Sequence, residues 1–547
     1  MSKRIPLLLS LLLIIVLGLV PLVSSAQTVP TPDEDTMVVS IGGEPGSMDP
    51  SQVGGATGGI NFYILWHLFG TLYELGQADG AIDPYLAHSF TVSEDGTEWT
   101  FHMHEGLTCH DGEPLTAEDA AYSFNRMADP ANGFTGNSAG FVNSSIGFVE
   151  ARADSELDVT IVANKPQNRA MRLGLISEVM VHCKDSYEAM SLEEASRNVI
   201  GSGPYSMGEW VPGEYMRIDR VEGFDLRNTY FDEIVWRFIP EPSTAVAEVI
   251  TGNVDILKGF PATQFDAITN SGVAEARSYP GTTRIYVGFQ LNPNAQFRVD
   301  NPDDVGAQAI METDVRVALQ YAVDVHAICE NLLLTTCQRA TSLVNRPNNH
   351  PTLEPYPYDP MKAEELLDAA GYPRGDDGVR FSLDLKARRV TGAGGSDVSL
   401  AIAQFLTDIG VQTEVVFLES ADFREQLIYH HLGPLYMGGT GGSKWSAQYD
   451  MADIPGHIAG CAEAETNYTH WNNDVWCDGW DALPALTGDP EAERALEIAM
   501  LEEFYHDPPW LMLYAGPRLE AVSNRLDYKS RADFFITAYD AKLKDDM

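Results

Sequence analysis

Apolar and polar positions along the first third of the chain predict strands mixed with helices. The run 37–41 is apolar and is followed by two glycines, as in a buried strand that ends at a turn. Residues 60–73 are apolar on all sides, which favours a buried helix. At 98–103 apolar and polar residues alternate as in a half-buried strand, and Thr116 is suited to cap the helix that follows.

A regular alternation of elements follows in the second half of the chain. Asp359, Pro360 and Gly371 stand in the order of a helix N-cap, a first turn and a C-terminal stop, so a helix is expected at 361–370. Strands are then expected at 379–386, 411–418 and 435–437, and helices at 396–409 and 421–431. This βαβαβ order predicts a parallel sheet with helices on its faces. Outside this unit, strands are expected at 233–239, 284–291 and 510–514, and helices at 243–251, 314–328 and 490–505.

Residues 1–26 have the sequence of a signal peptide. Basic residues precede an apolar run at 6–20, and small residues at 24–26 suit cleavage before Gln27. An uncleaved membrane anchor is the alternative. Residues 27–36, rich in Pro, Thr and acidic residues, are expected to form a flexible leader. No later run approaches the roughly 20 apolar residues of a transmembrane helix, so we expect a mature protein released into the periplasm.

The charge of the chain disfavours several kinds of partner. Its 547 residues include 35 Lys and Arg against 79 Asp and Glu, a formal net charge of −44. Such an excess of carboxylates repels nucleic acid and anionic lipid surfaces, so we expect no nucleic-acid partner. Because 44% of the residues are hydrophobic, the chain is too apolar for a disordered acidic protein and is long enough for two or three subdomains.

Six cysteines in an exported chain favour disulfide bonds. None of them forms a Cys-x-x-Cys motif, so neither a zinc ribbon nor a thioredoxin-type redox site is indicated. Six cysteines allow fifteen connectivities, and short spacing favours the local pairs. The preferred pairs are Cys329–Cys337 and Cys461–Cys477, which leave Cys109 with Cys183.

Several blocks of the chain resemble a known protein family. The block at 83–126 contains PYLAHSF and EDGTEWTFHMHEGLTCHDGEPLTAEDAAYSFNR. Further blocks stand in the family's order at 44–50 (EPGSMDP), 201–205 (GSGPY), 231–256, 314–324 and 358–373. Together they resemble the family 5 extracellular solute-binding proteins, the dipeptide-, oligopeptide- and nickel-binding receptors of ABC importers. The resemblance covers nearly all of the mature chain.

That resemblance implies an α/β fold, the two-lobed periplasmic-binding-protein-like fold (type II, cluster C-like) with an extra subdomain in lobe I. The expected segments are lobe I at 37–288, with the extra subdomain at about 60–200, lobe II at 289–487 and a return to lobe I at 488–547. It also implies a protein that captures a small solute between the lobes and delivers it to ABC permease subunits with their ATPases. We expect a monomer that needs no cofactor and catalyses no reaction.

The family's peptide receptors carry a Trp and an Asp on one stretch of lobe II, where the Asp pairs with the peptide α-ammonium. The matching stretch here is 435–450, LYMGGTGGSKWSAQYD. Gly439 stands at the position of the Trp and Gly442 at that of the Asp. A register shift could bring Asp450 or Asp453 into that role. Without such a carboxylate, a neutral or anionic solute is favoured, because a buried ammonium needs a salt-bridging partner.

Other residues are candidates for contact with a solute. Trp445 and Tyr449 offer flat aromatic faces, and the backbone N–H groups around Gly439 and Thr440 could meet a polar group. The resemblance adds Tyr63 in lobe I, and Arg284 and Tyr286 on an expected crossover strand. Packing in the core, or a flexible turn for the glycines, is the alternative at these positions. The resemblance also likens Cys461 and Cys477 to a disulfide-closed loop of some dipeptide receptors.

An enzymatic function is disfavoured by the sequence. Residues 136–140 (GNSAG) match the nucleophile elbow of serine hydrolases around Ser138, but they lie in a loop-like segment instead of between a strand and a helix. A secreted hydrolase is therefore the weaker alternative. His102 and His104 share one strand face and could hold a metal, but a surface strand is the simpler interpretation. We expect a peptide or peptide-like solute, with an oligosaccharide as the alternative.

Overall fold

The structure is a computed structural model that describes part of the chain. The described residues are 29–53, 58–75, 82–134, 142, 147–166, 178–335, 337–344, 349–389, 395–429, 431–441, 451, 467–486, 489–531 and 535–544. Several predicted features lie outside these residues: the signal peptide at 1–26, Ser138, Gly442, Trp445, Tyr449, Asp450, Asp453 and Cys461. Among the helices described, none combines the length and apolar character needed to cross a membrane.

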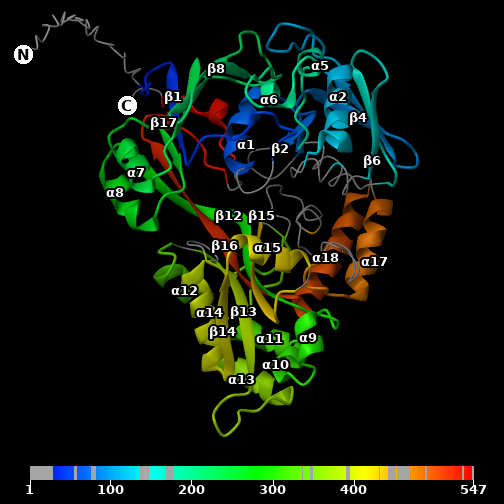
Figure 1. Cartoon of the computed structure of the whole chain (residues 1–547), viewed down its shortest axis with the longest axis vertical. Helices are drawn as coiled ribbons and strands as arrows, with labels where there is room; N and C mark the ends of the chain where they lie inside the picture. The colour runs from blue at the N-terminus through cyan, green and yellow to red at the C-terminus, as the bar shows by residue number, and fades with distance from the viewer. Residues whose placement is uncertain are drawn as a thin grey trace, which may run out of the picture.

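A single ten-stranded mixed sheet runs through both lobes of the molecule (Figure 1). Its strands, in order, are β14 (Val411–Leu418), β13 (Phe381–Arg388), β15 (Leu435–Gly441), β12 (Ala274–Phe289), β16 (Trp510–Ser523), β11 (Ile256–Lys258), β1 (Thr36–Ile41), β10 (Glu233–Phe238), β9 (Tyr215–Arg220) and β8 (Tyr205–Val211). The first three strands belong to lobe II and the last five to lobe I, and β12 and β16 pass from one lobe to the other.

Lobe I is built around β1, whose side chains are all buried. β1 pairs in parallel with β10 and β11, and the predicted strand at 37–41 is therefore confirmed. The helices on this side are α1 (Gly58–Leu68), α5 (Lys184–Glu188), α6 (Leu192–Ala195), α7 (Pro242–Ile250) and α8 (Phe265–Asn270). The predicted helix at 60–73 ends at Leu68, because the chain then turns into β2 (Tyr73–Leu75), which pairs with β3 (Ile82–Pro84). Close to the chain end, β17 (Leu526–Asp527) pairs with β18 (Lys542–Leu543).

A four-stranded antiparallel sheet forms a separate layer on lobe I. Its order is β4 (Ala87–Val92), β5 (Glu98–Met103), β7 (Asp158–Ala163) and β6 (Phe148–Ala153), and α2 (Ala117–Ala128) covers it. Thr116 caps α2 in a reciprocal capping box with Asp119, as its spacing predicts. The core of this layer contains Trp99, Phe101 and Phe124, each at most 1% exposed.

Lobe II contains the predicted βαβαβ unit. β13 pairs in parallel with both β14 and β15, which confirms the expected parallel sheet. The helices that follow β12 in the chain are α9 (Gln296–Asp300), α10 (Val305–Ala309), α11 (Thr313–Ala322), α12 (Val325–Asn331), α13 (Pro360–Ala369), α14 (Ser396–Asp408), α15 (Ser420–Ile428), α17 (Asp474–Ala482) and α18 (Pro490–His506). The single helix predicted at 314–328 is two helices, because Val323 is extended and Asp324 caps α12 through the N–H of Ala327.

The sheet is narrowest where β12 and β16 cross between the lobes. Pro280 of β12 lies opposite Pro517 of β16, and the register shifts between Pro280 and Arg284. β15 pairs with β12 only from Thr283 onward, and β11 pairs with β16 only from Glu520 onward. Among the described residues, the sheet at the two prolines is therefore two strands wide. This two-strand crossing is called the waist below.

Two of the three preferred disulfides are present among the described residues. Cys109 is bonded to Cys183 across 74 positions of sequence, and Cys329 to Cys337 across 8. Cys477 is also disulfide-bonded, whereas Cys461 lies outside the described residues. The first disulfide joins the loop before α2 to the start of α5, and the second holds the segment that follows α12.

Candidate functional site

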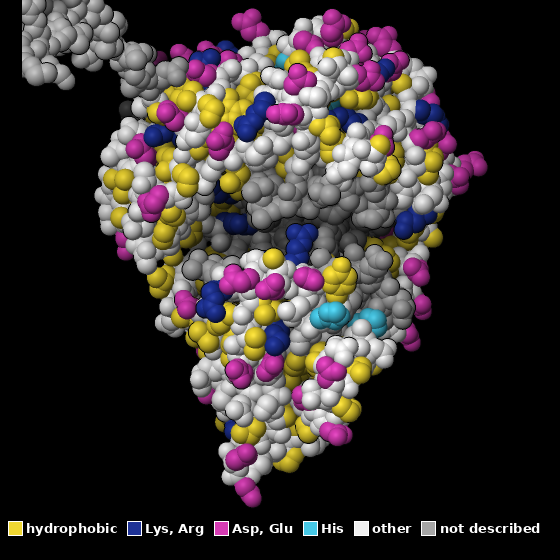
Figure 2. All heavy atoms as spheres, viewed as in Figure 1, with side chains coloured by type: hydrophobic (Ala, Val, Ile, Leu, Met, Phe, Trp, Pro, Cys, Tyr) yellow, Lys and Arg dark blue, Asp and Glu magenta, His cyan; other side chains and the backbone are white. Residues whose placement is uncertain are grey.

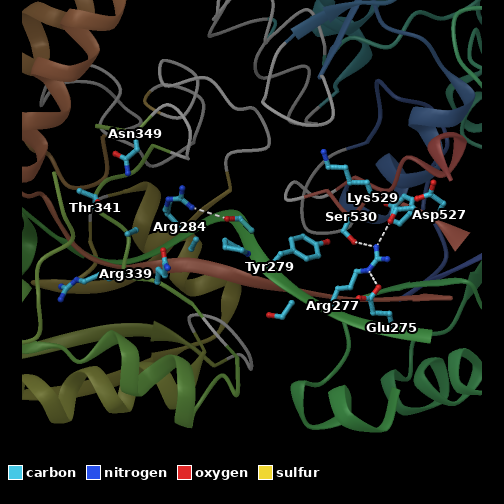
Figure 3. Close-up of a pocket in the computed structure, with 17 residues that line it drawn as sticks. Glu275, Arg277, Tyr279, Arg284, Arg339, Thr341, Asn349, Asp527, Lys529 and Ser530 are labelled. Carbon is cyan, nitrogen blue, oxygen red and sulfur yellow. Dashed lines mark hydrogen bonds and ion pairs between the residues drawn. The ribbon is translucent and has the colours of Figure 1, made fainter. Parts of the chain in front are cut away.

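A cavity of about 830 Å³ lies along the two crossing strands at the waist (Figure 3). Four segments far apart in the sequence form its walls: β12, the end of β17 with the residues that follow it, the segment after α12, and β16. The lining residues are Glu275, Arg277, Ser278, Tyr279, Pro280, Gly281, Arg284, Gln338, Arg339, Ala340, Thr341, Asn349, Ala515, Asp527, Tyr528, Lys529 and Ser530. Because these walls come from both lobes, a molecule in the cavity would contact both.

The lobe I end of the cavity is organised by Arg277. Its Nε donates to Glu275 at 2.9 Å, and its Nη1 donates to the carbonyl of Tyr528 at 2.8 Å and to Ser530 Oγ at 3.1 Å. Lys529, on the same wall, is exposed and makes no hydrogen bond or ion pair with any part of the protein that the structure describes. A bound anion could therefore reach an ammonium that no described protein group occupies.

The lobe II end is organised by Arg339, which is anchored to β16. Its Nε donates to the carbonyl of Met512 at 3.0 Å and its Nη1 to that of Tyr356 at 3.2 Å. All its hydrogen-bond acceptors within the described ranges are carbonyl oxygens, so no carboxylate balances its charge there. Burial lowers the pKa of Arg339 to about 10, and the group stays charged at neutral pH.

Arg284 also lines this end of the cavity, and the Arg339 guanidinium points away from it (Figure 3). Arg284 is 6% exposed, and its guanidinium donates to the carbonyls of Gly281 at 3.4 Å and Val344 at 3.3 Å. These two bonds are long, so they hold the side chain only weakly in place.

The cavity has a positive excess in a strongly acidic protein. Four cations line it, Arg277, Arg284, Arg339 and Lys529, against two carboxylates, Glu275 and Asp527. Both carboxylates already have cationic partners in the protein, since Glu275 pairs with Arg277 and Asp527 lies 3.3 Å from Lys542 Nζ. Figure 2 shows Lys and Arg side chains in the hollow between the lobes, with Asp and Glu along its lower rim and over the outer surface.

A buried charged row lies behind the lobe I end. Lys258, Glu520 and Arg277 occupy paired positions on β11, β16 and β12. Glu520 is fully buried, and the Ser530 side chain interacts with its carboxylate, although the contact is too poorly aligned to count as a full hydrogen bond. Burial raises the pKa of Glu520, although the fields of Lys258 and Arg277 oppose that rise.

Some of the site residues expected from the sequence come together in the structure. Arg284 lines the cavity, and it pairs across strands with Thr440 of β15, while Ile285 pairs with Gly439. Two separate groups of candidates, Arg284 with Tyr286 on β12 and Gly439 with Thr440 on β15, are thus neighbours in one sheet. Trp445, Tyr449 and Asp450 lie outside the described residues.

Tyr286 and Tyr63, two other site residues expected from the sequence, lie outside the lining of the cavity. Tyr286 is 3% exposed and stacks on Trp510, with ring centroids 3.8 Å apart and planes 9° from parallel. Tyr63 is half-buried on α1, and Lys258 Nζ lies 6.0 Å from its ring centroid. Neither tyrosine lines the cavity described above.

Arg277, Arg339 and Lys529 were not among the residues expected from the sequence. The residues at 275–279 alternate charged or polar with small side chains, which is a strand signal, but Pro280 and Gly281 directly follow them and mask it. Arg339 and Lys529 carry no local signal, because only the sheet topology brings them to one cavity.

The histidines considered as metal ligands lie on the outer layer of lobe I. His102 Nδ1 is 2.7 Å from Asp158 Oδ1, and the rings of His88 and His104 are 5.4 Å apart. Within the described part of the chain, no group of three or more His, Cys, Asp or Glu side chains is arranged to hold a metal ion.

Proteins of known function and known structure resemble this chain in sequence and in fold. The glutathione-binding protein GsiB of Escherichia coli (strain K12) is 23% identical over 450 residues, covering 81% of this chain and 82% of that protein. HbpA2 from Haemophilus parasuis superposes with a TM-score of 0.78 at 19% identity, covering 93% of this chain and 100% of that one. DppA from Helicobacter pylori, solved in complex with the peptide STSA, has a TM-score of 0.69 at 19% identity and covers 93% and 98%.

These likenesses confirm the two-lobed α/β fold of cluster C periplasmic binding proteins. The family model described as bacterial extracellular solute-binding proteins, family 5 Middle, matches residues 81–456. That match spans more than half of the chain, so the resemblance found in the sequence blocks is confirmed. The chain belongs to the bacterial extracellular solute-binding proteins of family 5, whose members bind solutes and are not enzymes.

Proposed function

We propose that this protein is the substrate-binding component of an ABC importer and captures a peptide or peptide-like solute in the cavity at the waist. The observation that carries the proposal is the position of that cavity, along the two strands that connect the lobes. Its volume of about 830 Å³ lies within the range typical of small-molecule sites, roughly 300–1,000 Å³.

Closure of the lobes follows from contacts on both sides of the cavity. Arg277 and Lys529 stand on the lobe I side, and Arg339 and Thr341 on the lobe II side. A solute that reaches both sides binds the closed form more tightly than the open form and shifts the population toward closure. We propose that bending takes place at the waist; the lobe boundaries expected at 288/289 and 487/488 stay predictions.

The solute class is supported by the relatives and by the lining. GsiB is a glutathione-binding protein, and DppA was solved with a bound peptide. The cavity offers charged and polar groups at both ends and the ring of Tyr279 between them (Figure 3), a combination that suits the carboxylates, amides and apolar side chains of a short peptide.

The cellular setting follows from the family and the first residues. Family 5 proteins are extracellular in the sense of lying outside the cytoplasm. We propose that residues 1–26 are removed as a signal peptide, that the mature monomer works in the periplasm, and that closed, loaded protein docks on permease subunits with their ATPases.

A thermal-shift screen combined with small-angle X-ray scattering tests this proposal. The screen compares short peptides, glutathione, oligosaccharides and polyamines, and a peptide-type hit should raise the melting temperature by mass action. The same hit should reduce the radius of gyration. Thr341→Trp, which fills the cavity, should abolish both effects, whereas the matched control Thr352→Trp, at an exposed position outside the cavity, should preserve them. A stabilising solute that leaves the radius unchanged, or that binds Thr341→Trp equally well, would overturn the proposal.

A further inference from the structure

We propose that the loop closed by the disulfide Cys329–Cys337 is a positioning element of the site, which fixes the lobe II wall of the cavity and braces it against β12 through Thr335. This inference rests on the proposed function of the cavity and adds a determinant of solute affinity that lies outside the cavity lining. It is drawn from one disulfide, one hydrogen bond that crosses the waist, and the place of the wall in the sequence.

The lobe II wall begins directly after the disulfide. The four consecutive residues 338–341 line the cavity, and Cys337 immediately precedes them. Its partner Cys329 is 1% exposed and packs in the same core cluster as the side chains of β13. On the other side, the N–H of Ala340 donates to the carbonyl of Leu513 on β16 at 2.9 Å. A wall anchored at both ends has little freedom left to lose when a solute contacts it, so less entropy opposes binding.

Thr335 carries the loop across the waist. Its Oγ1 lies 2.7 Å from Ser278 Oγ, and either hydroxyl can donate. Ser278 lines the cavity and lies on the lobe I side of Pro280, whereas the loop follows α12 in lobe II. The bond therefore joins a segment of lobe II to the crossing strand beyond the point at which the described sheet is two strands wide.

The backbone of the loop is held in a conformation that its own side chains do not impose. Leu334 has a φ of 52°, in the left-handed region, which a residue with a branched side chain keeps only where its surroundings require it. The Leu334 side chain is 53% exposed, so its packing does not supply that requirement. The constraints described beside it are the disulfide and the two bonds of Thr335, to Ser278 and from its N–H to the carbonyl of Cys329 at 3.2 Å.

Hydrogen exchange tests the positioning without any solute. In the variant Cys329→Ala, Cys337→Ala the amide of Ala340 should lose protection, because the wall has lost its anchor on the N-terminal side. The matched control is Cys109→Ala, Cys183→Ala, whose cysteines pack in the outer layer of lobe I and do not line the cavity. The control should leave exchange at Ala340 unchanged, although its longer loop makes it the more destabilising change.

Isothermal titration calorimetry connects the loop to affinity. The probes are trialanine and tetra-alanine with free termini, titrated at a temperature at which every variant is folded. Loss of Cys329–Cys337 should weaken binding about tenfold, because the freed wall must then be ordered when the peptide binds. Loss of Cys109–Cys183 should leave the affinity unchanged. A disulfide that only stabilised the fold would give no loss of affinity in either variant.

Thr335→Val keeps the disulfide and removes only the hydroxyl that reaches Ser278. The loss of this one hydrogen bond should weaken binding by about three- to tenfold. Ser278→Ala should have the same effect, and the two changes together should weaken binding no further, because both hydroxyls act through one bond. Thr352→Val, at an exposed position outside the cavity, is the matched control and should bind as the natural protein does.

The outcomes separate this inference from the proposed function. Unchanged exchange at Ala340, or unchanged affinity, in the variant without Cys329–Cys337 would overturn the positioning role and leave a peptide receptor in place. Additive losses from Thr335→Val and Ser278→Ala would show that Ser278 acts on the solute by itself, and the brace would be wrong. If neither peptide bound the natural protein, and none in the wider screen raised its melting temperature, the proposed function would fail, while hydrogen exchange would still decide whether the loop holds the wall.

Discussion

Pro280 of β12 lies directly opposite Pro517 of β16, at the point where the described sheet is two strands wide. Proline has no backbone N–H, so neither residue can donate to the ladder. Gly281 and Gly516 stand next to them, and glycine has the widest conformational freedom. The strands that join the lobes are thus least constrained where the lobes would have to move.

Hydrogen exchange should show this weak point directly. Backbone amides at 281–282 and at Gly516 should exchange faster than those at 285–289, which lie between two neighbouring strands. The double variant Pro280→Val, Pro517→Val restores two N–H donors and should slow exchange there and reduce the compaction caused by solute. Equal protection at 281–282 and 285–289 in the natural protein would show that the waist is not a preferred bending point.

The buried pair of Asp49 and Arg126 should dominate the stability of lobe I. Arg126 donates to both carboxylate oxygens of Asp49, at 3.0 and 2.6 Å, and the two side chains are at most 7% exposed. Burial favours the neutral acid, but hydrogen bonds from His182 and Arg126 outweigh it and hold the pKa of Asp49 well below its ordinary range. Asp49→Asn leaves a buried guanidinium without its counter-charge and should cost about 3–5 kcal/mol in urea unfolding.

A double-mutant cycle separates pairing from general damage. Asp49→Asn combined with Arg126→Met should cost clearly less than the two single changes added together, because the pair is lost only once. Lys362→Gln, which breaks an exposed ion pair with Glu365, should change stability by less than about 1 kcal/mol. Additive losses in the cycle would contradict a coupled pair.

His67 should make stability fall in mild acid. The ring is fully buried, its Nδ1 lies 2.8 Å from the carbonyl oxygen of Tyr63, and its Nε2 accepts from the N–H of Ala538 at 2.9 Å. This arrangement requires the neutral ring, and the nearby rings of Trp236 and Tyr539 add no charge. Burial lowers the pKa of His67 to about 3.

The sign of the effect follows from proton linkage. The unfolded chain takes up the proton near pH 6.5 and the folded chain only near 3, so the stabilisation is complete above pH 6.5 and is lost as pH falls toward 3. At about 1.4 kcal/mol per pH unit, roughly 2 kcal/mol should be lost between pH 6.5 and 5. Urea unfolding of His67→Gln should start from a lower stability and show a shallower decline; an unchanged slope would contradict this assignment.

The two described disulfides should differ in their contribution to stability. Cys109–Cys183 closes 74 positions of chain and Cys329–Cys337 only 8. Loop-closure entropy in the unfolded chain predicts about 4–5 kcal/mol for the first and about 2–3 kcal/mol for the second. Guanidinium unfolding of the double alanine variants measures each value, and a larger loss from the short loop would show that loop entropy is not the main term here.

The local pattern of apolar and polar residues predicted most helices and strands, because the period of each element can be recognised within a single segment. The βαβαβ unit at 379–437 and the cap at Thr116 are examples, since each depends on neighbouring residues. The long course of β12 was missed, because Pro280 and Gly281 interrupt its pattern, and so was the break between α11 and α12 at Val323.

The site was less accessible to sequence reasoning than the fold. Arg277, Arg339 and Lys529 come from segments separated by many elements and meet only because β12 and β16 carry them to one cavity. These three residues are cationic, whereas the chain as a whole has a net charge of −44. The composition therefore did not predict a cavity lined by cations. Arg284 was found, because the family resemblance indicated a crossover strand at its position.

Neighbouring glycines on β15 give a paired test of packing against site function. A Cβ added at Gly438 would lie 2.2 Å from Tyr286 Cζ, and that ring cannot retreat because it stacks on Trp510 at 3.8 Å. A Cβ at Gly439 would meet its nearest neighbour, Ile285 Cδ1, at 3.4 Å, an ordinary contact distance. Gly438→Ala should therefore cost about 1–3 kcal/mol, and Gly439→Ala should stay within about 0.5 kcal/mol of the natural protein in thermal unfolding.

The same two variants distinguish a glycine that is required for packing, Gly438, from a glycine that is expected to lie against the solute, Gly439. Gly439 is exposed and lies beside Arg284 in the sheet, so Gly439→Ala should change the affinity for a peptide hit while leaving the melting temperature nearly unchanged. Gly438→Ala should act mainly on the melting temperature, which should fall because the added methyl group displaces the ring of Tyr286. If the two variants lost equal stability, the tight approach of Tyr286 to β15 would not be what demands glycine at 438. If Gly439→Ala bound every probe as the natural protein does, β15 would border the cavity without touching its solute.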